Sequence, residues 1–195
     1  KSGRVFFDDI CKKNKIFLLK VENINQSKSI YHLKKYNIDW LFIIGWSQIA
    51  GHEVVKSPSK GVIGFHPTLL PKGRGRAPIP WAIIKNIQYT GVTVFKISDG
   101  IDRGDIFLQK KIKIKKNEDA TSLYLKVNEQ HIYLIKKLIP KLIKDKFKLI
   151  VQDEKKATYW PKRSPTDGEI NVNMSVSKAH RFIRALTHPY PGAFL

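Results

Sequence analysis

Short apolar runs alternate with segments of helical pattern along most of this 195-residue chain. Short runs of consecutive apolar residues favour buried strands, and apolar residues spaced three or four apart favour helices. The pattern predicts strands at 16–21, 39–46, 61–63, 90–97 and 106–114, and helices at 3–13, 30–36, 77–85, 119–144 and 176–186. The alternation up to residue 151 predicts an α/β fold, a sheet with helices on both faces.

Local signals predict where several of these helices begin and end. Ser29 is a candidate N-cap for one helix, and Asp119 or Thr121 for the longest. Pro78 suits the first turn of the helix after it, because its fixed φ fits there and its missing N–H is not needed. Pro140 lies inside the longest helix and predicts a kink or a split at that point.

The residue pattern of the sequence changes after Gln152. Residues 155–168 hold pairs such as Trp160-Pro161 and Asp167-Gly168, which predict an extended, turn-rich crossing. We expect one domain over residues 1–151, followed over 152–195 by a linker and the start of a smaller C-terminal region. Because the chain begins without Met and ends on an apolar stop, we also expect it to be an internal piece of a longer protein.

The charge and the cysteine content limit the possible binding partners and the cellular compartment. Lys and Arg outnumber Asp and Glu by 36 to 16, which gives a formal net charge of +20. That charge suits nucleic acid or an anionic substrate, although scattered lysines that solvate the surface are the alternative. No run approaches the roughly 18 apolar residues of a membrane helix, so we expect no membrane partner. The single cysteine, Cys11, excludes an internal disulfide and fits a reducing, cytoplasmic compartment.

The segment 64–81 combines the features of a ligand-binding loop. His66 follows an apolar run, and side chains at the end of a strand face the crevice of an open α/β sheet. Glycines and prolines hold the following backbone in turns, and Lys72, Arg74 and Arg76 add positive charge. We therefore expect this loop to hold a ligand.

A second loop, residues 98–105, is rich in Gly and Asp. Asp102 in this loop is a candidate partner for His66, because a carboxylate can fix the tautomer of an imidazole ring. A ring held in this way can steady a developing oxyanion. The residue types alone leave the pairing open, since many α/β proteins carry a His and an Asp near strand ends.

Three motifs follow one another through the two loops. They are His66-Pro67-Thr68-Leu69-Leu70-Pro71, Arg74-Gly75-Arg76-Ala77-Pro78-Ile79, and Thr90-Gly91-Val92-Thr93 with Asp99-Gly100-Ile101-Asp102-Arg103-Gly104-Asp105-Ile106. In this order they resemble the formyltransferase family that uses formyl-tetrahydrofolate. The resemblance implies a mostly parallel, Rossmann-like sheet in a catalytic domain over 1–151, preceded by a strand and a helix that this sequence lacks. It also implies transfer of a formyl group from formyl-tetrahydrofolate to a primary amine.

The family's catalytic trio is an Asn, a His and an Asp. By resemblance His66 and Asp102 take the last two positions, but Gly64 stands at the position of the Asn. A glycine has no side-chain amide to hold the formyl oxygen, and losing such a donor costs about 10²–10³-fold in rate in related chemistry. Either Gln48 or a backbone N–H substitutes for it, or this chain is a poor catalyst.

The resemblance also implies where the folate binds. The expected contacts are Leu41, Ile43, Gly45, Trp46, Gln48, Asp99 and Gly100. Core packing is the alternative role for Trp46, and turn formation is the alternative for Asp99. No Cys/His cluster suggests a metal site.

The choice of amine acceptor lies outside the shared core. Residues 160–170 and 184–194 are most similar to the branch that formylates nucleotide-linked amino-deoxysugars. The candidate substrate contacts are Arg74, Arg76, Arg163, Arg184 and Tyr190, with the guanidinium groups on phosphate and the ring on a sugar or base. Solvated loop charges and structural coupling between domains are the alternatives for these residues.

Two other functions stay open beside the sugar-nucleotide enzyme. One is methionyl-tRNA formyltransferase, because a basic chain suits tRNA. The other is a non-catalytic RNA- or anion-binding module on the same scaffold, which Gly64 and the net charge of +20 motivate. We expect a small nucleotide-sugar partner, keep tRNA as the alternative, and leave a homodimer open.

Overall fold

The computed structural model describes residues 5–46 and 48–195. Contacts divide the chain into two compact units, residues 1–63 and 64–195, and the division falls inside strand β2 (Gly61–His66). The main sheet has the strand order β1-β2-β4-β5.

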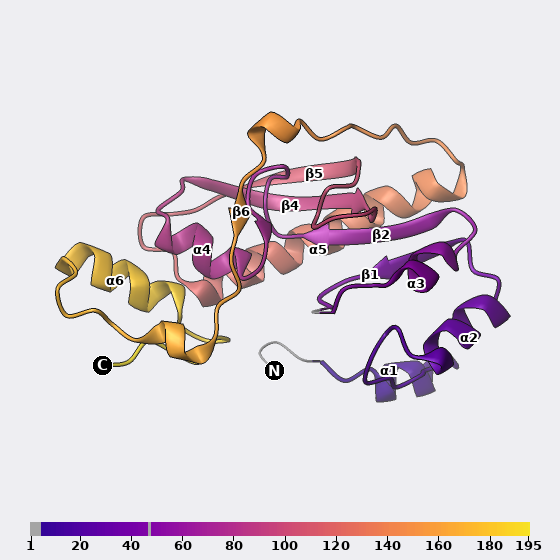
Figure 1. Cartoon of the computed structure of the whole chain (residues 1–195), viewed down its shortest axis with the longest axis horizontal. Coiled ribbons are helices and arrows are strands. Elements are labelled where there is room, and N and C mark those ends of the chain that lie inside the picture. The colour runs from indigo at the N-terminus through magenta and orange to yellow at the C-terminus, as the bar shows by residue number, and fades with distance from the viewer. Residues whose placement is uncertain (1–4, 47) are drawn as a thin grey trace. The chain divides into compact units, whose positions relative to one another are not determined.

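The first unit holds the helices α1 (Asp8–Lys13), α2 (Ser27–Lys35) and α3 (His52–Lys56) and the strand β1 (Trp40–Ile43) (Figure 1). Its loops are held by side-chain amides. The Asn25 side chain accepts a hydrogen bond from the Gly51 N–H (2.6 Å) and donates one to the Ile49 carbonyl (2.9 Å). An ion pair between Lys34 and Glu53 (2.9 Å) joins α2 to α3.

Several predictions for the first unit are wrong in detail. Residues 16–21 form no strand; Phe17 instead packs its ring against His32 and Tyr36, at centroid distances of 5.1 and 5.2 Å. The apolar run thus covers the aromatic face of α2 rather than pairing in a sheet. Ser29 is not an N-cap, since α2 begins at Ser27. The predicted helix at 3–13 begins at Asp8 in the structure, and its residues 3 and 4 lie outside the described part of the chain.

The second unit begins within β2 and also contains a small second sheet. After β2 come β3 (Arg74–Gly75), α4 (Pro78–Ile84), β4 (Tyr89–Lys96), β5 (Ile106–Lys113), α5 (Ala120–Ile143), η1 (Glu154–Lys156), β6 (Tyr159–Trp160), η2 (Pro165–Gly168) and α6 (Val176–Ala185). Strands β4 and β5 are antiparallel, with Thr90 opposite Ile112, so the sheet is mixed. The two-residue strands β3 and β6 pair in parallel. The α/β fold is confirmed.

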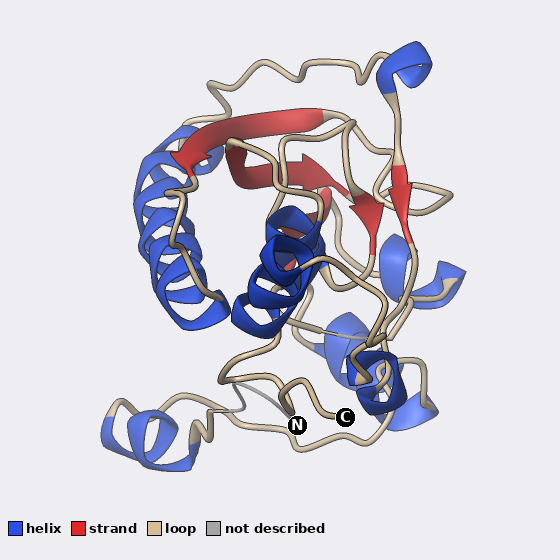
Figure 2. Ribbon diagram, turned by 90° about the vertical axis from the view of Figure 1, so that its left-hand side faces the viewer, coloured by secondary structure: helices blue, strands red, loops and turns tan. Residues whose placement is uncertain are grey.

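Helix α5 lies along β4 and β5 and supplies much of the core of this unit (Figure 2). Its buried residues recur at helical spacing: Ala120, Leu123, Val127, Leu134, Leu138 and Leu142. The predicted N-cap Asp119 is confirmed, because its carboxylate accepts a hydrogen bond from the Ser122 N–H at 2.8 Å. Pro140 does not split the helix, which continues to Ile143. The missing N–H falls in the last turn, where the helix is about to end.

No helix among the described residues is long and apolar enough to cross a membrane.

His131 makes the stability of the second unit depend on pH. This residue of α5 packs against the ring of Phe65 at a centroid distance of 5.5 Å, and burial lowers the pKa of His131 from 6.5 to about 4. Below pH 6.5 the unfolded chain takes up a proton that the folded chain excludes, so stability falls as the pH drops toward 4. We expect this group to cost up to roughly 3 kcal/mol over that window.

The measurement is urea unfolding at several pH values between 7 and 4. His131→Leu should flatten the decline relative to the unsubstituted chain, whereas His180→Gln, at an exposed position of α6, should leave it unchanged. Equal declines for the chain with and without His131 would contradict the prediction.

Candidate active site

His66 is the last residue of β2 and is only 6% exposed. Its Nε2 lies 2.7 Å from the Gly73 carbonyl oxygen, and its Nδ1 lies 3.5 Å from Oδ2 of Asp102. The two side chains that the sequence analysis paired therefore meet in the second unit. Both ring nitrogens face oxygen acceptors, so a protonated ring would find a partner for each N–H.

Asp102 is held in place through one oxygen and through its main chain. Its φ of +52° lies in the left-handed region, which costs free energy for a residue with a side chain. Oδ2 accepts a hydrogen bond from the Gly75 N–H at 2.9 Å and faces His66. Oδ1 has no hydrogen bond among the described residues. One oxygen of the carboxylate is thus used for positioning, and the other is left to accept a proton.

Gln152, which no sequence signal marks, fixes the loop that carries Asp102. Its Nε2 donates to the carbonyl oxygens of Asp102 (2.8 Å) and Gly104 (2.7 Å). Its Oε1 accepts two hydrogen bonds from Arg74, at 2.8 and 3.2 Å. No motif surrounds Gln152 in the sequence; its burial, at 5% exposed, is visible only in the structure.

Arg74 belongs to this hydrogen-bond network, and its side chain has no exposed surface that could contact a substrate phosphate. The side chain is 0% exposed. Its guanidinium group forms a two-fold pair with Glu154, at 2.7 and 2.9 Å, and also donates to the Tyr159 hydroxyl at 3.0 Å. Hydrogen bonding to Arg74 lowers the pKa of Glu154, so the pair stays charged at neutral pH. The structure therefore gives Arg74 a supporting role instead of the expected contact with substrate.

The glycine between Arg74 and Arg76 is required by close packing. Gly75 has a φ of +107°, and a Cβ at this position would lie 2.3 Å from the carbonyl oxygen of Trp160. The neighbouring Arg76 is exposed, and its N–H donates to the same carbonyl at 3.0 Å. Strand β6 thus closes over the loop that positions Asp102.

The neighbours of residue 64 leave little room for a side chain at this position. A Cβ on Gly64 would lie 2.9 Å from the ring of Phe95 and 3.0 Å from Ile97. The space of an Asn side chain is therefore filled. Gln48, the expected substitute, already uses its amide within the first unit: it accepts from the Ile24 N–H (3.0 Å) and donates to the Glu22 carbonyl (2.8 Å).

The other expected folate contacts lie in accessible positions of their own units. Leu41 and Ile43 are half-buried on β1, and Trp46 is 43% exposed. Gly45 has a φ of +64° and no atom within 4 Å of where a Cβ would stand. In the second unit Asp99 and Gly100 are exposed. Within the described residues no group of His, Cys, Asp and Glu could hold a metal ion.

The expected substrate residues of the C-terminal segment are packed against other groups. The guanidinium group of Arg163 lies between the rings of Trp81 (5.0 Å) and Phe182 (5.3 Å), and burial lowers its pKa. Arg184 donates to the carbonyl oxygen of Glu118. Burial raises the pKa of the Tyr190 hydroxyl. Among the described residues, no hydrogen bond, ion pair or ring contact joins these three side chains to His66.

The sequence and fold match known proteins. The family model described as Formyl transferase matches residues 8–139, more than half of the chain. The bifunctional polymyxin resistance protein ArnA of Wigglesworthia glossinidia brevipalpis is 36% identical over 99% of this chain and 30% of its own length. A methionyl-tRNA formyltransferase of Lachnospira eligens is 31% identical over 92% of this chain and 56% of its own length.

Solved structures share the fold. A 4-N formyltransferase from Francisella tularensis has a TM-score of 0.78 at 24% identity, covering 96% of this chain and 75% of that chain. The sugar 3N-formyl transferase WlaRD, solved in the presence of dTDP and 5-N-formyl-THF, has a TM-score of 0.72 at 22% identity, covering 91% of this chain and 61% of that chain. The present chain spans less than two thirds of either curated relative. On the match to the family model, the chain belongs to the formyl transferase family.

Proposed function

We propose that this chain is the catalytic part of an enzyme that transfers a formyl group from formyl-tetrahydrofolate to the primary amine of a nucleotide-linked amino-deoxysugar. The observation that carries the proposal is the pairing of His66 with Asp102 at 3.5 Å, with Oδ1 of Asp102 unpaired among the described residues. Two family motifs that lie far apart in the sequence thus supply one acid–base pair.

The residues present fit a formyl donor. The free Oδ1 of Asp102 can accept a proton, and the exposed backbone around Asp99 and Gly100 can pair with a polar ring edge. Formyl-tetrahydrofolate, when bound, supplies an electrophilic formyl carbon carried on nitrogen. Within the second unit, the proposed contacts of the folate are Asp99 and Gly100.

His66 and Asp102 divide the chemistry between them. Both ring nitrogens of His66 face oxygen acceptors, so the ring acts from a fixed position and stabilises negative charge on the formyl oxygen through the positive charge of its protonated form. Oδ1 of Asp102 accepts the proton that the amine loses as its nitrogen bonds to the formyl carbon. In the net reaction the amine gains the formyl group, the bond between that carbon and the folate nitrogen breaks, and the folate nitrogen takes the proton.

A sugar formyltransferase with the same fold supports the choice of acceptor. WlaRD is a sugar 3N-formyl transferase whose structure includes dTDP. A nucleotide sugar carries a diphosphate, which suits a chain with a net charge of +20. The second candidate is methionyl-tRNA formyltransferase, because one relative of 31% identity bears that name and because a basic chain suits tRNA.

A substrate panel decides between these functions. The full-length protein that contains this chain is supplied with formyl-tetrahydrofolate and with nucleotide-linked sugars bearing an amine at different ring positions, beside initiator methionyl-tRNA. We expect one amino sugar to be formylated with a kcat/KM roughly 100-fold or more above that of the tRNA. Product mass measures the transfer, and His66→Asn is the inactive control.

The other outcomes of this experiment would support the other candidate functions. Formylation of methionyl-tRNA alone would establish the second candidate. Formylation of no acceptor, together with RNA binding that weakens steeply with salt, would instead identify a non-catalytic RNA-binding module.

A further inference from the structure

A cationic hollow lies in the second unit, and its lining includes Arg184, one of the expected substrate contacts. It has a volume of about 260 Å³ and lies where the end of α4, the segment after β5 and helix α6 come together. Lys115, Lys116, Arg181 and Arg184 line it, beside the side-chain amides of Asn86 and Gln88. No Asp or Glu is among its lining residues.

Each of the two arginines donates a hydrogen bond to a main-chain oxygen. Nε of Arg181 donates to the Ile84 carbonyl (3.2 Å) at the end of α4, and Arg184 donates to the carbonyl of Glu118. A carbonyl oxygen fixes the orientation of a guanidinium group without neutralising its charge. In addition, Nε of Arg184 is buried and has no acceptor among the described residues.

The acidic residues in this region are already used. Asp119 accepts a hydrogen bond from the Ser122 N–H at 2.8 Å, and its charge also interacts with that of Arg184. The Glu118 carboxylate pairs with Lys126 and accepts a hydrogen bond from the Lys115 N–H at 3.1 Å. Glu118 is 5% exposed, so its carboxylate is not available to neutralise the hollow. The four cations therefore face the hollow with no balancing carboxylate in its lining.

The hollow is separate from the His66–Asp102 pair. Lys115 and Lys116 follow the end of β5, whereas the loop of Asp102 comes just before its first residue. An eight-residue strand spans about 26 Å, at 3.3 Å per residue. The cations thus lie at the opposite end of β5 from the loop of Asp102, and neither His66 nor Asp102 lines the hollow.

We propose that this hollow binds a phosphate group. Guanidinium forks, lysine point charges and amide N–H donors are the groups that recognise phosphate oxygens. A volume of about 260 Å³ is several times the ~30 Å³ share of a water molecule. It therefore accommodates a phosphate or a diphosphate with some of its hydration. The same chemistry would suit a small phosphate compound or a phosphate of an RNA backbone.

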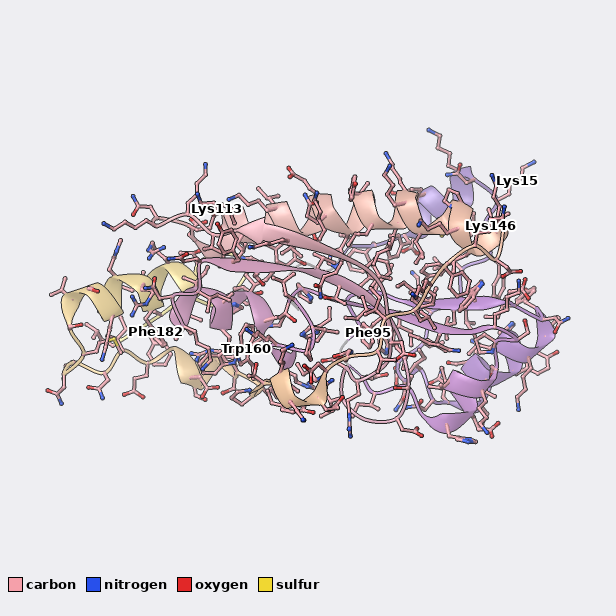
Figure 3. All side chains as sticks on the ribbon, turned by 90° about the horizontal axis from the view of Figure 1, so that it is seen from above. Lys15, Phe95, Lys113, Lys146, Trp160 and Phe182 are labelled. Carbon is pink, nitrogen blue, oxygen red and sulfur yellow. The ribbon has the colours of Figure 1, made fainter. Side chains whose placement is uncertain are left out.

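The test titrates pyrophosphate into the full chain and measures the heat of binding. The variant K115Q/K116Q removes two exposed cations of the hollow and should fold normally. The control K146Q/K148Q removes two exposed charges beyond the C-terminal end of α5; Figure 3 shows Lys146 at the opposite end of α5 from Lys113. We expect K115Q/K116Q to raise the Kd about tenfold and the control to leave it within about twofold.

A second variant and a second ligand complete the design. Arg184→Gln should weaken pyrophosphate binding at least as much as K115Q/K116Q. A short single-stranded RNA that competes with pyrophosphate and binds more tightly would identify a backbone phosphate as the ligand; failure to compete would identify a small phosphate compound. Absence of saturable binding, or equal weakening in both double variants, would overturn the proposal. The His66→Asn variant should bind pyrophosphate normally, so the outcome is independent of formyl transfer.

Discussion

Replacing Asp102 with Asn should lower kcat/KM for formyl transfer by roughly 10³-fold without unfolding the protein. An Asn side chain can still accept the hydrogen bond that the Gly75 N–H gives to Oδ2. It can neither take a proton nor place a negative charge beside His66. The substitution therefore separates the positioning of this side chain from its chemistry.

The measurement is a steady-state assay on the full-length protein with its best acceptor, together with thermal unfolding. Glu129→Gln, at an exposed position of α5, removes the same charge and should leave kcat/KM within about twofold. His66→Asn should lose activity on a similar scale. If Asp102→Asn kept more than a tenth of the activity, Asp102 would not be the proton acceptor.

Replacing Arg74 with Met should destabilise the second unit by about 3 kcal/mol. Met keeps much of the apolar stem but removes every hydrogen bond to Gln152, Glu154 and Tyr159. Gln152 is 5% exposed, so its amide oxygen would be left buried without a donor. The Glu154 side chain is 48% exposed and would be rehydrated, so its share of the loss is small.

Arg103 provides the matched control. It lies 3.3 Å from the same carboxylate of Glu154, but its side chain is 50% exposed. Arg103→Met should therefore cost less than about 1 kcal/mol in urea unfolding. Equal losses for the two variants would show that the interior network of Arg74 does not stabilise the fold.

Sequence reasoning could predict the pairing of His66 with Asp102, because both belong to motifs of one family, His66 at the end of a strand and Asp102 in the loop between two strands. It could also predict α5, whose N-cap Asp119 and apolar spacing are local signals. The local signals gave a wrong prediction at residues 16–21, because an apolar run alone does not indicate whether a neighbouring strand is available to pair with it. There the partner was the aromatic face of α2.

The role of Arg74 could not be predicted for a related reason. A charged residue in a glycine-rich loop has the pattern of a ligand contact. Its true partners, Gln152 and Glu154, lie 78 and 80 residues further along the chain. Nothing in the sequence near those residues indicates that they fold back over the loop. The crowding of Gly64 by Phe95 is likewise a property of packing between two strands, which a motif comparison does not contain.

The contact of Gln152 with the loop of Asp102 bears on where this protein can be cut. A fragment ending at residue 151 would match the end of the predicted catalytic domain. It would remove the amide that holds the carbonyl oxygens of Asp102 and Gly104, and with it Glu154, the counter-ion of Arg74. The smallest excisable piece that keeps the carboxylate in place therefore extends through β6, to Trp160 at least.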